Sequence, residues 1–323
     1  MRMIRPQSLA ENIVVVDGSS GSGKSLLAPI LSSLARGELW KINDVYERLC
    51  VMDHCNLIDR DAAISMVRTA ADTDLYDAMI GRNTNFRASD ESSAQANCLM
   101  DRYQQRLGIK EGDAIVAKIR HTKPLLFLLT HYILGESELL FKAFGKSLVL
   151  LIVSVRHPVW LIQNWYGAKW HDRHGLDPRD FQPCIDVDGQ VAPWMMYGKE
   201  NEFVDASPLE KSILAVSAIL DRGTRFYEQL AISDKEKIVF VPFEDFARNP
   251  RPILQDLTTR MKTTKTSLTT QLLEKMNIPR EFPEGFVEKE RVRFNQLMKK
   301  ERVGEEYQAA VDRLCCAYEN TYL

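Results

Sequence analysis

The sequence predicts a three-layer α/β/α fold, in which a parallel sheet around a phosphate-binding loop is covered by helices on both faces. Two observations lead to this prediction. Short, continuously apolar runs rich in Val, Ile and Leu alternate with longer segments of helical periodicity, as in parallel sheets that are buried on both sides. The first of these runs leads directly into a loop rich in glycine and serine, which is followed by an apolar helix start. We therefore expect functional side chains just after the carboxyl ends of the strands.

The individual elements follow from the same patterns. Buried strands are predicted at residues 12–17, 113–119, 147–155 and 237–242. A helix is predicted over residues 61–80, because acidic residues stand at its start and apolar residues recur on one face. A second long helix is predicted over residues 208–230.

We expect one domain over residues 1–323 with two additions. Residues 171–207 contain Pro178, Pro183 and Pro193 together with several Gly and Asp, which predicts a long loop or lid. Residues 264–323 are charged and helical in pattern, so the carboxyl-terminal region is expected to consist of helices.

Composition narrows the class of partner. The chain has 42 basic and 44 acidic residues and a net charge of −2, so no overall field attracts nucleic acid or an anionic membrane. Its longest apolar runs, 125–129 and 148–153, are far shorter than the ~20 residues of a membrane span. The six cysteines show neither a CxxC pair nor metal-ligand spacing, which suits reduced thiols. We expect a cytoplasmic protein without nucleic acid as a partner, whereas the oligomeric state is open.

The residues after the first strand match the phosphate-binding loop pattern GxxxxGK[ST] in full, with the sequence GSSGSGKS. In this pattern glycines let backbone N–H groups approach an anion, and the helix start adds its dipole. Lys24 would place a charge on the phosphates, and Ser25 would contact a metal or a phosphate oxygen. The alternative is a simple surface turn. The residues expected to bind phosphate are Gly18, Gly21, Ser22, Gly23, Lys24 and Ser25.

The strand at residues 147–155 ends in a cation. Enzymes that use ATP or GTP usually hold Mg²⁺ with a carboxylate at the end of a second strand, whereas this strand ends in Arg156-His157-Pro158. Pro158 is suited to open the next helix, so Arg156 and the helix dipole together would bind a second phosphate. The alternative is that Arg156 pairs with a nearby carboxylate.

At these residues the chain resembles the sulfotransferase family. Arg156-His157-Pro158, followed by an aromatic helix, is similar to the Arg-x-Pro segment of that family, and residues 239–246 are similar to its strand ending in Tyr-Glu-Asp. The resemblance implies that the loop holds the 5′ end of 3′-phosphoadenosine 5′-phosphosulfate without a metal. It also implies that Arg156 holds the 3′-phosphate, with Asn164 standing where the family has a serine. Lys24 occupies the position found in nucleotide kinases, since the family's lysine position is Gly21 here.

The resemblance further implies a histidine base just after a strand. The apolar run that ends at Ile119 is followed by Arg120 and His121, so His121 is the candidate to take the proton of the acceptor hydroxyl. The alternative for His121 is an exposed loop residue. His131 lies in an apolar stretch and is interpreted as a packed core residue. No metal-binding residues are predicted.

Residues 81–93 are dense in hydrogen-bonding side chains. Arg82 and Arg87 would suit a carboxylate, phosphate or sugar acid, and Asn85 would suit a hydroxyl, so these residues are candidates for the acceptor site. A plain connection between helices is the alternative.

The function expected from these features is transfer of a sulfonate group to a hydroxyl of a small-molecule or carbohydrate acceptor. Two other classes stay open. An ATP- and Mg²⁺-dependent kinase would require Glu244 or Asp245 as the metal ligand. A nucleotide-binding regulatory protein would bind the nucleotide without transferring any group.

Overall fold

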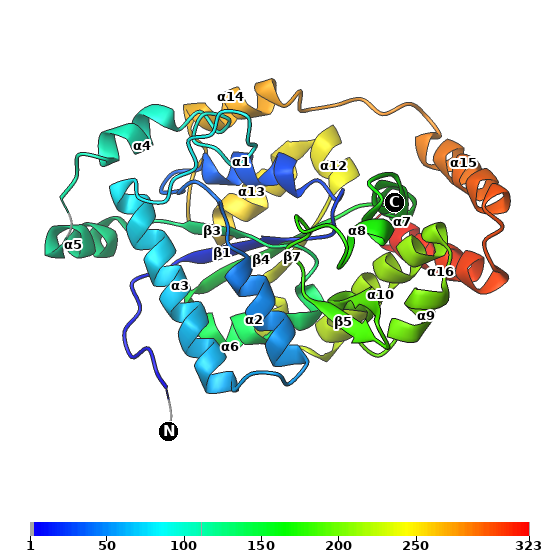
Figure 1. Cartoon of the computed structure of the whole chain (residues 1–323). Coiled ribbons are helices and arrows are strands. Elements are labelled where there is room, and N and C mark those ends of the chain that lie inside the picture. The colour runs from blue at the N-terminus through cyan, green and yellow to red at the C-terminus, as the bar shows by residue number, and fades with distance from the viewer. Residues whose placement is uncertain (1–2, 111, 323) are drawn as a thin grey trace.

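The computed structural model describes residues 3–110 and 112–322, and its centre is a five-stranded parallel sheet (Figure 1). The strands lie in the order β2-β3-β1-β4-β7. All neighbouring strands are parallel, so all five carboxyl ends lie along one edge of the sheet. Their bounds are β1 Ile13–Asp17, β2 Lys41–Ile42, β3 Leu126–Leu129, β4 Leu148–Val155 and β7 Ile238–Pro242.

Helices cover both faces of this sheet and create two cores. In β1, Ile13 and Val15 face one core, whereas Val14 and Val16 face the other. The first core is formed with α2 (Asp44–His54), α3 (Arg60–Ile80), α5 (Asp113–Thr122), α6 (Glu138–Phe144), α7 (Pro158–Gly167), α10 (Pro208–Gln229), α15 (Phe286–Lys300) and α16 (Glu305–Tyr322). The second is formed with α1 (Lys24–Ser32), α4 (Met100–Arg106), α12 (Phe243–Arg248), α13 (Pro250–Arg260) and α14 (Ser267–Lys275). This arrangement confirms the predicted α/β fold.

Most of the predicted elements are present, and one is wrong. The strands expected at 12–17, 147–155 and 237–242 correspond to β1, β4 and β7, and both long helices, α3 and α10, are confirmed. Residues 113–119, predicted as a strand, lie in α5. Ile115 and Ile119 are the buried residues of α5 and lie four positions apart, which is the spacing of a one-sided helix. The strand that belongs here is β3, which begins after α5.

The segment predicted as a long loop has structure of its own. It contains α8 (Trp170–Arg173), an antiparallel hairpin of β5 (Cys184–Val187) and β6 (Gln190–Pro193), and α9 (Glu200–Asp205). The hairpin packs against α9, and α9 in turn lies beside α10 (Figure 1).

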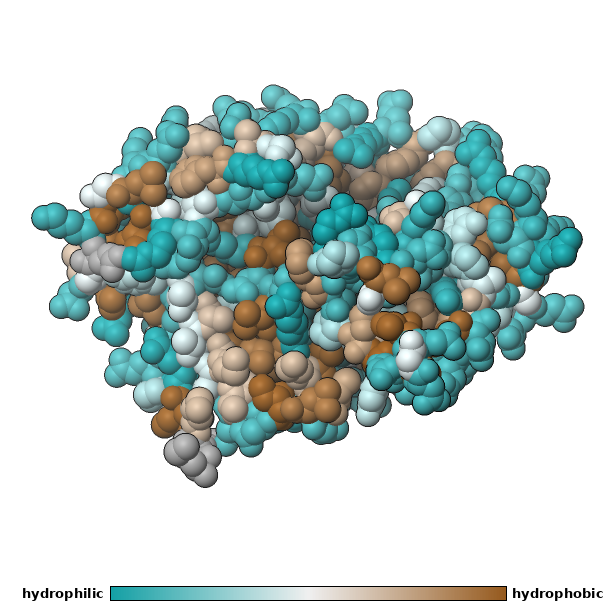
Figure 2. Space-filling model, viewed as in Figure 1, coloured by the Kyte–Doolittle hydropathy of each residue, from teal (hydrophilic) through white to brown (hydrophobic). Residues whose placement is uncertain are grey.

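The carboxyl-terminal region consists mainly of the helices α14, α15 and α16. No helix among residues 3–110 and 112–322 is long and apolar enough to cross a membrane. Figure 2 shows that hydrophilic groups cover much of this face, while hydrophobic groups gather over α2 and α3.

Candidate functional site

The phosphate-binding loop joins β1 to α1 and requires glycine in its backbone. Gly21 has φ +85°, and a Cβ added there would lie 2.8 Å from Cγ of Asn164. Gly23 caps α1 with φ +102°, and a Cβ there would collide with the ring of Phe243. Both backbone conformations are ones that L side chains rarely adopt. The loop is therefore held in a conformation that packs closely against α7 and the start of α12.

Lys24 begins α1 and lies inside the loop. Its Nζ donates hydrogen bonds to the carbonyl oxygens of Gly18, at 2.5 Å, and Ser19, at 3.0 Å. Burial lowers the pKa of Lys24 to about 8, although the carboxylates of Asp17 and Glu47 act in the opposite direction. A bound anion would stabilise the charged form of this lysine, because the negative charge compensates for the hydration that the buried ammonium group has lost. The loop thus has the chemistry of a phosphate or sulfonate site.

A cavity of about 460 Å³ opens beside the loop. Besides loop residues that include Lys24 and Ser25, it is lined by Trp40 and Ile42, by Asp90–Ser92, and by Leu129 and His131. Ile42 ends β2 and Leu129 ends β3, so the cavity lies at the carboxyl edge of the sheet, on the β2 side of the loop. This is the edge at which open parallel sheets bind their ligands.

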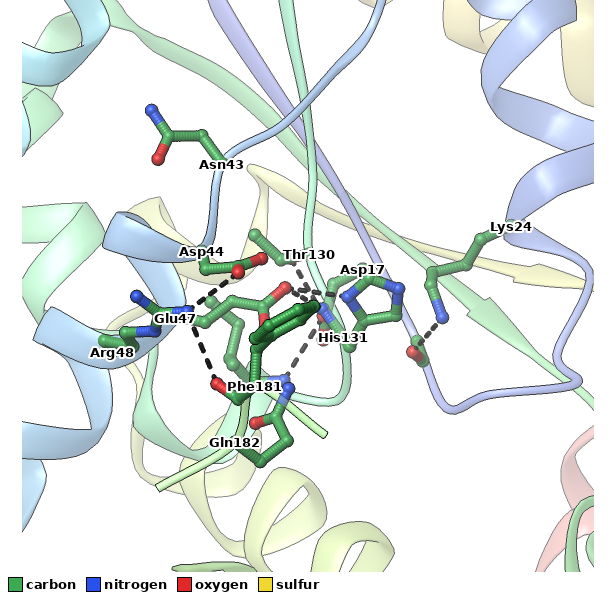
Figure 3. A network of polar contacts seen from close by, with 12 residues as sticks. Asp17, Lys24, Asn43, Asp44, Glu47, Arg48, Thr130, His131, Phe181 and Gln182 are labelled. Atoms are coloured by element: carbon green, nitrogen blue, oxygen red, sulfur yellow. Dashed lines mark hydrogen bonds and ion pairs between the residues drawn. The ribbon is translucent and has the colours of Figure 1, made fainter. Parts of the chain in front are cut away.

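His131 and Glu47 form a paired acid–base group at this cavity (Figure 3). Oε1 of Glu47 lies 2.8 Å from Nδ1 of His131 and accepts a second hydrogen bond from the His131 backbone N–H, also at 2.8 Å. The side chain of Glu47 is 6 % exposed and that of His131 is 29 % exposed. Because the carboxylate only accepts, Nδ1 carries the proton and Nε2 is left as the basic nitrogen.

Asp17 ties His131 to the loop. The carboxylate of Asp17, at the end of β1, accepts hydrogen bonds from the Thr130 hydroxyl and from the backbone N–H groups of Ile133 and Leu134. Its burial raises the pKa of Asp17, and Lys24 acts in the opposite direction. The turn that carries His131 is therefore fixed to the start of the phosphate-binding loop (Figure 3).

On the other side of the loop lies a cationic and aromatic group. Arg156 follows β4, and its Nη1 donates to the carbonyl oxygen of Gly21 at 2.9 Å. The Arg156 guanidinium lies 4.5 Å from the centre of the Phe243 ring and 5.6 Å from that of Trp160. Burial lowers the pKa of Arg156, the nearby carboxylate of Glu244 acts in the opposite direction, and the charge of Arg280 adds a smaller lowering effect.

Two buried polar atoms in this region lack a hydrogen-bond partner among the described residues. They are Nε of Arg156 and Oγ of Ser22. Buried donors are normally paired, and each unpaired one costs roughly 1–3 kcal/mol. An anion that binds across the loop and Arg156 would satisfy such groups.

The structure brings some of the sequence-predicted site residues together and separates others. Gly21, Arg156 and Asn164 meet at the loop, as the sequence led us to expect. His121 does not reach it. His121 lies exposed in the last turn of α5, before β3 rather than after it, because the strand on which its assignment depended is a helix.

The three acceptor candidates are not among the residues that line the cavity. Arg82 pairs with Asp77 at 3.6 Å, and Arg87 pairs with Asp90 at 3.6 Å. Asn85 donates to Ser92 and Asp90. The part of this segment that lines the cavity is Asp90–Ser92, so Arg87 and Asn85 contact its wall, and their role with an acceptor stays a prediction.

Sequence reasoning missed His131 and Glu47. His131 carries a local signal, since it stands two residues after the apolar strand β3, as His121 stands two residues after the apolar run that ends at Ile119. No local signal marks Glu47, which lies 84 residues from its partner.

The structure is an α/β fold in which a paired histidine and glutamate lie on one side of the glycine-rich loop and an arginine among aromatic rings lies on the other. No family model and no curated protein matches the chain. Among solved structures it is similar to sulfotransferases. The sulfotransferase domain from the curacin biosynthetic pathway aligns at 14 % identity with a TM-score of 0.43, covering 84 % of this chain and 78 % of that one.

Two further sulfotransferases show the same level of similarity. STF9 from Mycobacterium avium aligns at 13 % identity and a TM-score of 0.42, covering 90 % of this chain and 77 % of its own. A sulfotransferase from Alicyclobacillus acidocaldarius aligns at 14 % identity and a TM-score of 0.37, covering 97 % and 96 %. Similarities of this size assign no role to any residue, so the roles proposed below come from the geometry of this chain.

Proposed function

We propose that the protein is a sulfotransferase-like enzyme that transfers a sulfonate group from 3′-phosphoadenosine 5′-phosphosulfate to a hydroxyl of a small-molecule or carbohydrate acceptor. The observation that carries the proposal is the order of groups along the sheet edge. His131 follows β3, the phosphate-binding loop follows β1, and Arg156 follows β4, and these three strands are neighbours. A base, an anion site and a second cation thus lie side by side, as a donor with phosphates at two positions requires.

The donor would lie across the loop. The loop N–H groups, Lys24 and Ser25 would hold its phosphosulfate, and the donor's 3′-phosphate would lie near Arg156 and Asn164. Nε of Arg156 and Oγ of Ser22, which are buried without a hydrogen-bond partner among the described residues, would donate hydrogen bonds to this anionic donor. The aromatic rings around Arg156, those of Phe243 and Trp160, would offer faces to the adenine.

The acceptor would enter the cavity with its hydroxyl at His131. As the hydroxyl oxygen forms its bond to sulfur, Nε2 of His131 takes the proton, and the bond between sulfur and the bridging phosphate oxygen breaks. The leaving group is 3′,5′-adenosine bisphosphate. Glu47 would hold the imidazole in the right tautomer and stabilise the imidazolium that forms. We assign the base role to His131 in place of His121.

A kinase is the second candidate, because Lys24 and Ser25 both line the cavity in the arrangement that nucleotide kinases use. A kinase would also need a carboxylate to bind Mg²⁺. Glu244, a candidate from the sequence, is buried and accepts a hydrogen bond from Tyr318 at 2.6 Å.

Calorimetric titration separates the two candidates. We expect 3′,5′-adenosine bisphosphate to bind without Mg²⁺ and more tightly than ADP or ATP. Preference for ATP that depends on Mg²⁺ would support the kinase instead. Tight binding of the bisphosphate without transfer to any hydroxyl acceptor would indicate a regulatory protein.

A further inference from the structure

His157 is a buried histidine next to Arg156, and it caps the helix α7. It stands between Arg156 and Pro158, the first residue of α7, and it is 0 % exposed. Its Nδ1 accepts a hydrogen bond from the backbone N–H of Val159 at 3.3 Å. The N–H groups in the first turn of a helix have no partner within the helix, so a side chain that accepts from one of them stabilises the helix start.

The contacts of its two ring nitrogens define the state of this imidazole. Because a backbone N–H can only donate, Nδ1 of His157 must offer a lone pair, and the proton of the neutral ring is on Nε2. Nε2 lies 3.0 Å from Oε1 of Glu319 and donates to it. Burial lowers the pKa of His157, whereas the carboxylates of Glu319 and Glu244 act in the opposite direction. The charge of Arg291 adds a smaller lowering effect.

The partner of His157 comes from the carboxyl-terminal helix. Glu319 lies on α16, 162 residues further along the chain, and α16 lies beside α7 (Figure 1). Nη1 of Arg291, on α15, donates to both carboxylate oxygens of Glu319, at 3.0 and 3.1 Å. The ring of Tyr318 lies 5.4 Å from that of His157, and its hydroxyl donates to Glu244 at 2.6 Å. The helix α16 thus holds His157 by a hydrogen bond and by a ring contact.

The start of α7 also carries a ring that contacts Arg156. Trp160 lies in the first turn of α7, and its ring centre is 5.4 Å from that of His157 and 5.6 Å from the Arg156 guanidinium. Since His157 directly follows Arg156, the cap fixes both the backbone at Arg156 and the Trp160 ring. A displaced helix start would therefore move the guanidinium, whose Nε is buried without a partner among the described residues.

We propose that His157 is a positioning residue for the anion site at Arg156. It fixes the start of α7 as a neutral cap, and Glu319 of α16 holds its imidazole in the required tautomer. The carboxyl-terminal helix thereby contributes to the anion site through His157. That the anion is a 3′-phosphate rests on the proposed function. The cap itself does not depend on the donor, so the two are testable separately.

The test compares 3′,5′-adenosine bisphosphate with 5′-AMP by calorimetric titration into the full-length protein near pH 7. His157→Ala removes the cap, whereas His157→Asn is the conservative variant, because asparagine is a good cap without an imidazole. Glu319→Ala removes the partner of Nε2. Asp312→Ala is the matched control, because Asp312 also pairs with Arg291, at 3.1 Å, about two turns before Glu319 on α16.

We expect His157→Ala to weaken binding of the bisphosphate about fivefold or more, because the helix cap is lost. Glu319→Ala should weaken it about threefold or more, because a buried donor loses its partner. His157→Asn and Asp312→Ala should stay within about twofold of the wild type, and so should the affinity of every variant for 5′-AMP. In the His157→Asn background Glu319→Ala should have no further effect, because its effect passes through the imidazole.

Two further measurements do not depend on the donor. In the nitrogen-15 spectrum of the labelled protein near pH 7, the imidazole signals that disappear in His157→Asn should be those of a neutral ring with its proton on Nε2. Hydrogen exchange in the first turn of α7, followed by mass spectrometry, should be faster in His157→Ala and unchanged in His157→Asn.

Four results would overturn the inference. They are unchanged bisphosphate affinity in His157→Ala, equal losses for both nucleotides, equal losses in His157→Ala and His157→Asn, and a proton on Nδ1 of His157. If the bisphosphate does not bind to the wild type, the proposed donor falls, and the spectra and the hydrogen exchange then decide whether His157 positions the start of α7.

Discussion

Replacing Arg156 with Ala tests the donor site most directly. In the proposed complex Arg156 meets only the 3′-phosphate, so its loss should weaken 3′,5′-adenosine bisphosphate and leave 5′-AMP unaffected. These two ligands differ only in that phosphate. Nε of Arg156 is buried without a partner among the described residues and would donate the new hydrogen bond.

The magnitude follows from that bond. A hydrogen bond to a charged group contributes about 1.5–3 kcal/mol, which corresponds to a loss of about 10- to 150-fold in affinity. Arg156 also contacts Gly21 and Phe243, so the substitution could disturb the loop. Binding of 5′-AMP reports on such a disturbance, because 5′-AMP uses the loop but not the 3′-phosphate site.

The assay is calorimetric titration of both nucleotides into the wild type, Arg156→Ala and Arg156→Lys. We expect the alanine variant to lose 10- to 150-fold for the bisphosphate and less than about threefold for 5′-AMP. Arg156→Lys keeps the positive charge but loses the planar guanidinium group. Its affinity for the bisphosphate should therefore lie between those of the wild type and Arg156→Ala. Equal losses for both nucleotides, or no loss for either, would refute the placement of the 3′-phosphate at Arg156.

Three further predictions concern the loop and the base. Burial lowers the pKa of Lys24 to about 8, so affinity for 3′,5′-adenosine bisphosphate should begin to fall near pH 8 and then decrease by up to about tenfold per pH unit above it, as the ammonium loses its proton. In radiolabelled sulfonate transfer to any acceptor found by screening, His131→Ala should slow the rate by ~10²- to 10⁴-fold, whereas His121→Ala should not. Gly21→Ala should destabilise the protein to urea by about 1–2 kcal/mol, because its positive φ and the contact with Asn164 both resist a Cβ.

Each of these predictions has a control. Lys24→Arg stays charged throughout, so it should abolish the fall in affinity, and persistence of that fall would assign it to another group. A rate loss in His121→Ala equal to that in His131→Ala would overturn the choice of base. Gly145 also has a positive φ, but a Cβ there meets nothing within 4 Å, so Gly145→Ala separates backbone strain from the crowding at Gly21.

The phosphate-binding loop could be predicted from the sequence because its determinants are local. The strand, the eight loop residues and the helix are contiguous, and glycines stand where the backbone takes positive φ. The residues after β4 could be predicted for the same reason, because Arg156 and Pro158 directly follow an eight-residue apolar strand. Adjacent residues were enough to indicate an anion site with a second cation close to it.

The histidine could not be placed in the same way. A short apolar run does not distinguish a strand from one face of a helix, and residues 113–119 and 126–129 are both such runs. Tertiary packing decides between them, because β3 is buried between β1 and β2, whereas α5 buries only Ile115 and Ile119. The strand predicted at 113–119 made His121 the candidate base, whereas our proposal places the base at His131, after β3.

The sequence by itself determined the strands β1, β4 and β7, the loop and the cation that follows β4, because strand, turn and helix signals act over a few residues. Only the tertiary structure decided what surrounds the loop. Glu47 and His131 are 84 residues apart, Glu47 on the helix after β2 and His131 after β3. They meet because neighbouring parallel strands bring their carboxyl ends to one edge, and no periodicity along the chain records which residues share that edge.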